Sequence, residues 1–168
     1  MKYSEARDTI KSGDLIFLTH RKWSSWYDIK VQLVRFFTAS EYCHAAIAWC
    51  IGGRVFIIES VVPLVRIVPL STLADDGFYF APSKISMSSA EMEFALSKVG
   101  TGKYSQIRAV LAQLIGIKIG DGQFLECAEF VIACRRLSGA DLGDKATPSA
   151  VAQAALISGS AINFVSKD

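Results

Sequence analysis

The stretch HAAIAWCIGGRVFIIES, residues 44–60, consists of two apolar runs separated by Gly52 and Gly53. Two strand-like runs joined by a glycine pair are typical of a β-hairpin with a two-residue turn, because glycine readily adopts the backbone conformation that both turn positions require. We therefore predict antiparallel strands over residues 44–51 and 54–60. In such a hairpin Ile51 lies opposite Arg54.

The register of this hairpin decides which side chains share a face. Counting back from the turn, Ala46 lies opposite Glu59, and the alternation of side chains puts His44 on the same face. His44 is then the diagonal neighbour of Glu59, about 7–8 Å away between backbones and within side-chain reach. The prediction depends on an even-length turn, since an odd one would move Glu59 to the other side. The opposite face carries an ordinary apolar set: Ile47, Trp49, Phe56 and Ile58.

The segment ECAEFVIACRRLSG, residues 126–139, carries the marks of a helix. Glutamates open it, two arginines close it and a glycine follows, so both ends suit the helix dipole. Cys127 falls in the first turn, where unpaired backbone N–H groups and the positive end of the dipole favour the nucleophilic thiolate form of a cysteine. Cys127 is therefore the candidate nucleophile.

The hairpin and this helix together supply a candidate catalytic site. The side chains that share the face of His44, such as Ala46 and Ala48, are small, and we expect the Cys127 helix to approach the sheet on that face. Cys127, His44 and Glu59 then fill the roles of nucleophile, general base and orienting carboxylate in an acyl-transfer site. Taken singly, each residue has a common structural explanation, because free cysteine is among the most buried residue types. The conjunction of the three carries the prediction.

The remaining cysteines and the second histidine have simpler interpretations. Cys43, Cys50 and Cys134 are predicted to be packing residues with free thiols, because the spacing of the cysteines matches no short zinc-binding pattern and an unexported chain keeps its thiols reduced. We expect no structural metal and no cofactor. His20, beside basic residues in a predicted loop, is expected to be solvated.

The other expected elements follow from shorter signals. Ser88 with Glu91 predicts a capping box for a helix that ends at Gly100, and Thr147 followed by Pro148 opens another helix. Strands first and helices mainly after them predict an α+β fold in which an antiparallel sheet packs against helices. The further expected elements are a strand over 14–19, a helix within 25–37, strands within 63–70 and 77–82, a helix over 104–115 and a last strand within 161–166.

The composition is typical of one soluble domain with a large core. The chain has 168 residues, 51% of them hydrophobic, and a net charge of +2, and we predict a single domain over residues 1–168. No apolar run approaches the roughly 18–20 residues of a membrane span, and the start lacks a secretory signal. No block of like charge suits nucleic acid. We expect a cytoplasmic protein that does not bind nucleic acid. If the protein acts outside the cytoplasm, another system must deliver it there.

The order of these motifs resembles the circularly permuted branch of the NlpC-type papain-like cysteine peptidases, which includes lecithin retinol acyltransferase-like proteins. His44 precedes Cys127 in this chain, whereas the cysteine comes first in unpermuted relatives. The resemblance covers about residues 12–136. Three of its motifs resemble strands of the family: SGDLIF (12–17) resembles the Gly-Asp opening strand, YCHAAIAW (42–49) the histidine strand, and VFIIES (55–60) the strand with the acidic residue. The fourth, ECAEFV (126–131), resembles the nucleophile helix.

This resemblance implies a permuted papain-like fold with the nucleophile at a helix N-terminus. It assigns Cys127 as nucleophile, His44 as general base and Glu59 as the group that orients His44, the same three residues that the pattern alone selects. The stretch GKYS (102–105) resembles a Tyr-Asp element that often precedes the nucleophile helix, which makes Tyr104 a candidate substrate contact, although a serine replaces the aspartate.

Two departures from the family pattern surround the cysteine. Ala128 stands where serine is usual, and Glu126 places a charge directly before the nucleophile. A carboxylate at that position opposes thiolate formation through like charge unless its side chain turns out to solvent. These departures leave the three catalytic roles filled and bear on the substrate class.

The leading functional prediction is a cysteine amidase or peptidase that cleaves an amide or related acyl bond through a thioester. The implied substrates are cell-wall peptides or lipid-linked acyl groups. One alternative is an acyltransferase at a membrane surface, because residues 20–37 combine basic residues with tryptophans. A simpler explanation, which we favour, is that Trp26, Leu33 and Phe36 face the core. The other alternative is a non-catalytic interaction module that retains the fold.

Overall fold

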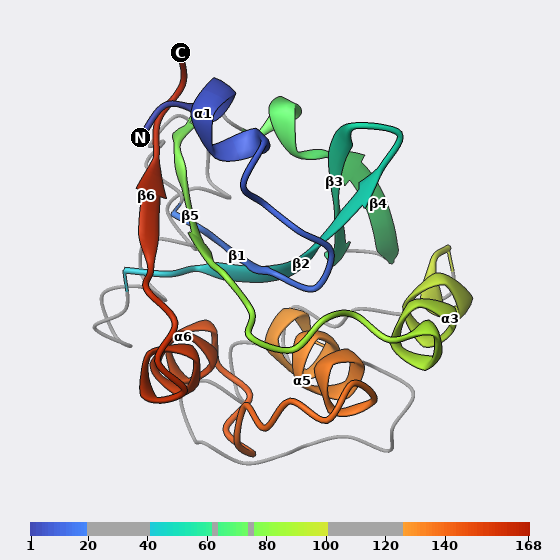
Figure 1. Cartoon of the computed structure of the whole chain (residues 1–168). Coiled ribbons are helices and arrows are strands. Elements are labelled where there is room, and N and C mark those ends of the chain that lie inside the picture. Colours follow the sequence, from blue (N-terminus) through green and yellow to red (C-terminus); the bar gives the residue numbers. More distant parts are fainter. Residues whose placement is uncertain (20–40, 62–63, 74–75, 101–125) are drawn as a thin grey trace, which may run out of the picture.

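A single antiparallel sheet organises the chain (Figure 1). The computed structural model describes residues 1–19, 41–61, 64–73, 76–100 and 126–168. In these residues six strands lie in the order β4-β3-β2-β1-β5-β6, and every pairing is antiparallel. The strands are β1 (Leu15–Leu18), β2 (His44–Ile51), β3 (Arg54–Ser60), β4 (Val65–Pro69), β5 (Phe78–Ala81) and β6 (Asn163–Val165). With the helices below, they confirm the predicted α+β class.

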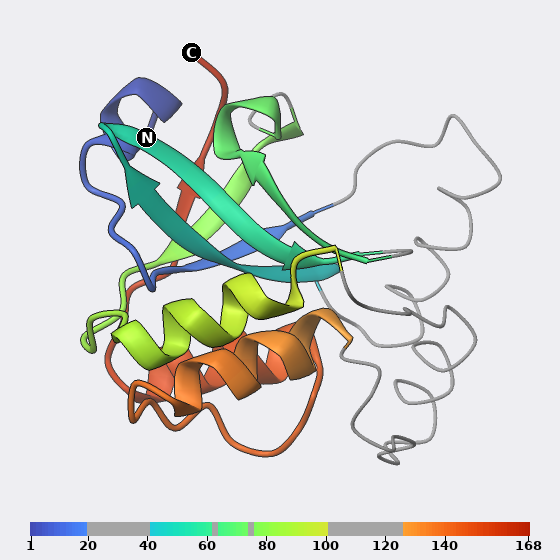
Figure 2. The same ribbon diagram turned by 90° about the vertical axis from the view of Figure 1, so that its right-hand side faces the viewer.

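The helices divide between the two sides of the sheet, as Figure 2 shows. They are α1 (Tyr3–Arg7), α3 (Ser89–Lys98), α5 (Cys127–Arg136) and α6 (Pro148–Ile157), with a short 3₁₀ turn, η1 (Leu70–Thr72). The three longer helices lie on one side and α1 lies on the other. None of the helices in the described part of the chain is long and apolar enough to cross a membrane.

The β2–β3 hairpin has the predicted register. Ile51 pairs with Arg54, and the pairing continues to Ile47 opposite Ile58. The two turn residues have positive φ angles, 58° at Gly52 and 72° at Gly53. Both positions of a type I′ turn require this conformation, which explains why a glycine pair defines the turn so clearly in the sequence.

The apolar residues form two clusters, one on each side of the sheet, and they correct the predicted docking of the nucleophile helix. Phe130 of α5 belongs to the cluster that contains Ile47 and Ile58, whereas Ala46 and the neighbouring Ala48 belong to the other cluster. The helix therefore packs on the face of large side chains. Burial against a helix removes more apolar area from water there than on the alanine face. The small side chains instead accommodate the N-terminal segment, including Ala6 and Ile10.

Most other predicted elements are present, with shifted ends. Ser88 caps α3 by accepting a hydrogen bond from the Glu91 N–H, and Thr147 caps α6, with Pro148 as its first residue. Glu91 does not return the capping-box contact, because its side chain turns into the interior. The first strand is Leu15–Leu18, one residue shorter at each end than expected. The helix α1 was not predicted, and the expected helices within 25–37 and 104–115 lie outside the described residues.

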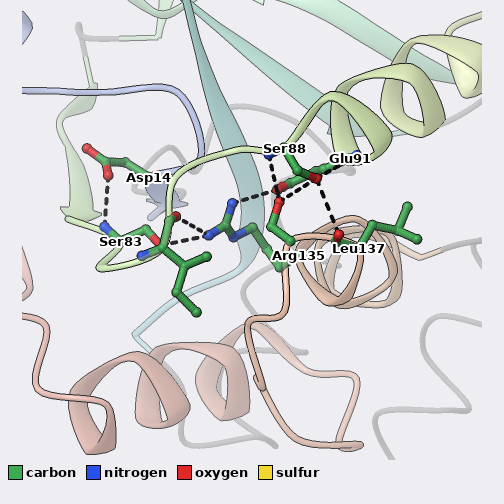
Figure 3. A network of polar contacts seen from close by, with 8 residues as sticks. Asp14, Ser83, Ser88, Glu91, Arg135 and Leu137 are labelled. Atoms are coloured by element: carbon green, nitrogen blue, oxygen red, sulfur yellow. Dashed lines mark hydrogen bonds and ion pairs between the residues drawn. The ribbon is translucent and has the colours of Figure 1, made fainter.

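A buried ion pair fixes the C-terminal half of α5 (Figure 3). The Arg135 side chain is 1% exposed and that of Glu91 is fully buried, and Arg135 Nη1 lies 2.7 Å from Glu91 Oε2. The other terminal nitrogen, Nη2, donates to Ser83 Oγ at 2.7 Å and to the Ile85 carbonyl at 2.6 Å. The hydroxyl of Ser138 also contacts Glu91. These bonds join α5 to α3 and to the loop before it, and so hold the helix that carries Cys127.

Candidate active site

Cys127 is the first residue of α5, and so lies in the first turn of a helix, as the sequence predicted. Glu126 is the N-cap residue of this helix, and the Glu129 carboxylate accepts a hydrogen bond from the Glu126 backbone N–H at 3.2 Å. Cys127 is 5% exposed. The sulfur therefore sits in the first helical turn, where the backbone dipoles favour negative charge.

His44 and Glu59 make the contact that the hairpin register predicted. The Nε2 atom of His44 lies 2.8 Å from Glu59 Oε2. The histidine side chain is 14% exposed and the glutamate only 1%. Such a short contact between a buried carboxylate and an imidazole fixes the ring orientation.

The imidazole of His44 also makes a side-chain hydrogen bond with the thiol of Cys127. Because Nε2 is occupied by Glu59, Nδ1 is the ring nitrogen left for the sulfur. His44 opens its strand and Cys127 opens its helix, so they meet at the ends of their elements, and α5 reaches the imidazole although it packs on the Ile47 face. The structure thus brings together the three residues selected from the sequence.

The charges of this group support one another. Burial lowers the pKa of His44, but the facing Cys127 and Glu59 more than offset this effect and raise it to about 10. Burial raises the pKa of Glu59, and hydrogen bonds and charge from His44 and Arg66 outweigh burial and hold it below its ordinary value. Both shifts favour a charged imidazole beside a charged carboxylate, next to the sulfur of Cys127.

Arg66 belongs to this group and was missed in the sequence. It pairs directly with Glu59 across β3 and β4. Its Nε and Nη2 atoms each lie 2.7 Å from Glu59 Oε1, and its side chain is 47% exposed. A single arginine in the apolar run PLVRIVPL was a usable signal. The turn before that run has no residue pair that fixes its length, so the pairing with Glu59 did not follow from the pattern.

Glu126 does not turn out to solvent. Its carboxylate is half-buried, and burial and the nearby Glu129 raise its pKa to about 7. A fraction of Glu126 is therefore protonated at neutral pH, which reduces the like charge beside Cys127.

The remaining sequence candidates take other positions. All four cysteines are free thiols. Cys43 Sγ donates to the Leu18 carbonyl at 3.1 Å and Cys50 Sγ to the Ile10 carbonyl at 3.3 Å, and Cys134 is fully buried in the core. Ala128 is a core residue at 1% exposure. Tyr104, with the neighbouring Ser105, and His20 lie outside the described residues.

The comparisons with known proteins bear on the fold. No protein-family model matches the chain, and no curated protein matches it. Among solved structures, the chain is similar to the metalloprotein yiiX from Escherichia coli O157:H7, a DUF1105 protein, with a TM-score of 0.58 and 16% identity. The match covers 94% of this chain and 97% of that protein. At this identity the likeness shows a shared fold and nothing about activity.

Proposed function

We propose that this protein is a cysteine hydrolase that cleaves an amide or related acyl bond through a thioester intermediate. Cys127 is the nucleophile, His44 the general base and acid, and Glu59 the group that orients His44. The observation that carries the proposal is the position of the His44 imidazole, bonded to Glu59 at 2.8 Å and to the thiol of Cys127. A nucleophile, a base and an orienting group in contact are the recurring signature of acyl-transfer sites.

The reaction proceeds in two stages. In the first, the Cys127 thiol passes its proton to His44 and Sγ attacks the carbonyl carbon; the carbon–nitrogen bond then breaks, and the leaving amine takes that proton from His44. In the second, His44 accepts a proton from water, the hydroxide adds to the thioester, and the carbon–sulfur bond breaks to release the acid. The backbone N–H groups of Cys127 and Ala128, in the first turn of α5, are the donors that stabilise the oxyanion.

The permuted papain-like fold is part of this proposal. The antiparallel sheet, the histidine on a strand and the cysteine at a helix N-terminus support it, with the histidine earlier in the chain than the cysteine. We propose peptides or acyl-bearing molecules as substrates, cell-wall peptides and lipid-linked acyl groups among them. Tyr104 remains a proposed substrate contact.

The structural neighbour is described as a metalloprotein. Among the residues that the structure of this chain describes, no group of three or more His, Cys, Asp or Glu side chains is placed to hold a metal ion. The contacts of His44, Glu59 and Cys127 are those of an acid–base pair with a thiol. We therefore base the proposed chemistry on the thiol.

A thiol-reactivity profile tests the proposal without knowledge of the substrate. Iodoacetamide at neutral pH should alkylate Cys127 far faster than Cys43, Cys50 or Cys134, as measured by peptide mass spectrometry over time. Incubation with libraries of activated peptide and lipid esters should then leave an acyl adduct on Cys127, visible in the intact mass. Four equally slow thiols and no adduct would favour the non-catalytic interaction module.

The same trapping experiment separates hydrolysis from acyl transfer. Water resolves the adduct in a hydrolase, so the acid product should appear at the same rate with or without added amines and alcohols. An acyltransferase instead resolves the adduct faster when its acceptor is present, and mass spectrometry of the product identifies that acceptor.

A further inference from the structure

The guanidinium of Arg66 lies against the same carboxylate that holds the imidazole of His44. Glu59 is 1% exposed and divides its two oxygens between two partners: Oε2 faces His44 at 2.8 Å, and Oε1 faces Arg66 at 2.7 Å. Each oxygen is thus committed to one cation. This division leaves the carboxylate little freedom to rotate away from the imidazole.

We propose that Arg66 is a positioning residue of the active site, which keeps Glu59 ionised and aligned so that Glu59 can orient His44. The inference rests on the proposed cysteine chemistry. It extends the site to a linear series, Cys127, His44, Glu59 and Arg66, supplied in order by α5, β2, β3 and β4. Arg66 is separated from the sulfur by two side chains, so it acts through Glu59 and not on the substrate.

The energetics of a buried carboxylate explain why the site needs Arg66. A nearly fully buried glutamate favours the neutral acid, because desolvation penalises the charged form. The groups that face Glu59 from the neighbouring strands are His44 on β2 and Arg66 on β4, and only the arginine keeps its charge at every working pH. When His44 gives up its proton during the reaction, Arg66 remains as the fixed counter-charge.

The strand pairing supports a built contact. Glu59 and Arg66 are directly opposed in the β3–β4 ladder, where side chains on one face lie about 4.5–5.5 Å apart at Cβ. Two donors of one guanidinium, Nε and Nη2, converge on a single carboxylate oxygen. Lysine has one ammonium in place of this planar fork and restores the charge without the geometry.

The test measures the pH dependence of Cys127 alkylation in wild type, Arg66→Met and Arg66→Lys. In Arg66→Met the pKa of Glu59 should rise, so the acid limb of the alkylation profile should move upward by about one pH unit. The rate at neutral pH should fall by about tenfold, as is typical when a supporting partner of a functional side chain is lost. Arg66→Lys should recover part of the rate.

The matched control is Arg54→Met. Arg54 is an exposed arginine at the turn end of the same hairpin, and its loss should leave the alkylation profile unchanged.

A double-mutant cycle completes the test. In a Glu59→Gln background, Arg66→Met should have no further effect on the alkylation rate, because Arg66 acts only through the Glu59 charge. An equal effect in both backgrounds would overturn the proposal, as would an Arg66→Met profile identical to wild type. A purely structural role would lower the thermal midpoint and leave the acid limb in place. If wild-type Cys127 itself alkylates slowly, the proposed function fails, and that result is separate from any difference between the Arg66 variants.

Discussion

The two ends of α5 carry the same kind of interaction and put it to different use. At the C-terminal end, Arg135 pairs with the fully buried Glu91 at 2.7 Å. At the N-terminal end, His44 pairs with the almost fully buried Glu59 at 2.8 Å. Burial and distance do not distinguish the two pairs. The difference lies in the cation, since a guanidinium keeps its proton and an imidazole exchanges it.

The neighbouring thiols sharpen this contrast. Cys134 lies near the Arg135 pair, and burial, with Glu91 charge added, raises its pKa well above the ordinary range. Cys127 lies against the imidazole of His44. In the proposed function the N-terminal pair serves catalysis because one of its members can transfer a proton and a nucleophile lies within its reach.

The largest effect is expected at the N-terminal end. Cys127→Ala and His44→Ala should each reduce turnover by a factor on the order of 10⁴ or more, with the circular dichroism spectrum unchanged, because each removes a member of one catalytic unit. The double variant should be little worse than either single one. The measurement is single-turnover acyl transfer with any substrate that the wild type processes. Near-normal turnover in Cys127→Ala would end the proposed mechanism.

The next effect is expected at the C-terminal end, and it concerns stability. Glu91→Ala leaves Arg135 buried without its partner, which should lower the free energy of unfolding by about 3–5 kcal/mol. Urea denaturation measures this loss. Alkylation of Cys127 should keep its wild-type rate under conditions where the variant is folded. A selective loss of Cys127 reactivity at unchanged stability would show that the C-terminal pair serves the active site and would break the comparison.

Glu59→Gln should have a smaller effect than loss of the base. The glutamine keeps the shape and one oxygen acceptor and removes the negative charge that stabilises the imidazolium, so a rate loss of about tenfold to hundredfold is expected. The pH dependence of alkylation gives a second readout. The pKa of His44 should fall, because Glu59 is one of the groups that raise it, and the alkaline limb should move downward. Activity as low as that of His44→Ala would mean that Glu59 does more than orient the ring.

Cys134→Ala is the control for the cysteine itself. It should cost on the order of 1 kcal/mol or more in unfolding free energy, because it removes a fully buried sulfur from the core. It should not change turnover. A specific rate loss at wild-type stability would place Cys134 in the mechanism and contradict the comparison.

The parts of the site that could be read from the sequence are those set by local rules. The glycine pair fixed the hairpin register, and the register brought His44 to Glu59. The glutamates at its start, with the arginines and the glycine at its end, located α5 and put Cys127 in its first turn. In both cases short-range backbone geometry decides the outcome, and a single sequence contains that information.

The parts that could not be predicted depend on tertiary packing. Alternation identified the two faces of the hairpin, but the choice of face for α5 depends on which elements compete for each, and the N-terminal segment took the alanine face. Arg66 was missed because the register of β3 with β4 is set by a turn without a clear signature. Glu91 fitted the capping-box pattern, and its side chain instead pairs with an arginine 44 positions further along the chain.

The smallest effect concerns Glu126, the N-cap residue of α5. Its pKa is raised to about 7 from an ordinary value of 4.5, so the folded state binds its proton more tightly than the unfolded chain. The stabilisation this provides is fully present below about pH 4.5 and is lost as pH rises through 7. Glu126→Gln keeps the size of the side chain and removes the titration. Compared with the variant, the wild type should therefore lose stability between pH 5 and pH 8, by less than about 1 kcal/mol because the carboxylate is partly solvated. Urea denaturation at both pH values measures the difference.

In the same variant, alkylation of Cys127 should be faster than wild type above pH 7 and unchanged near pH 5, since only the ionised carboxylate opposes the thiolate. Equal rates at pH 8 would show that the Glu126 charge does not reach the sulfur.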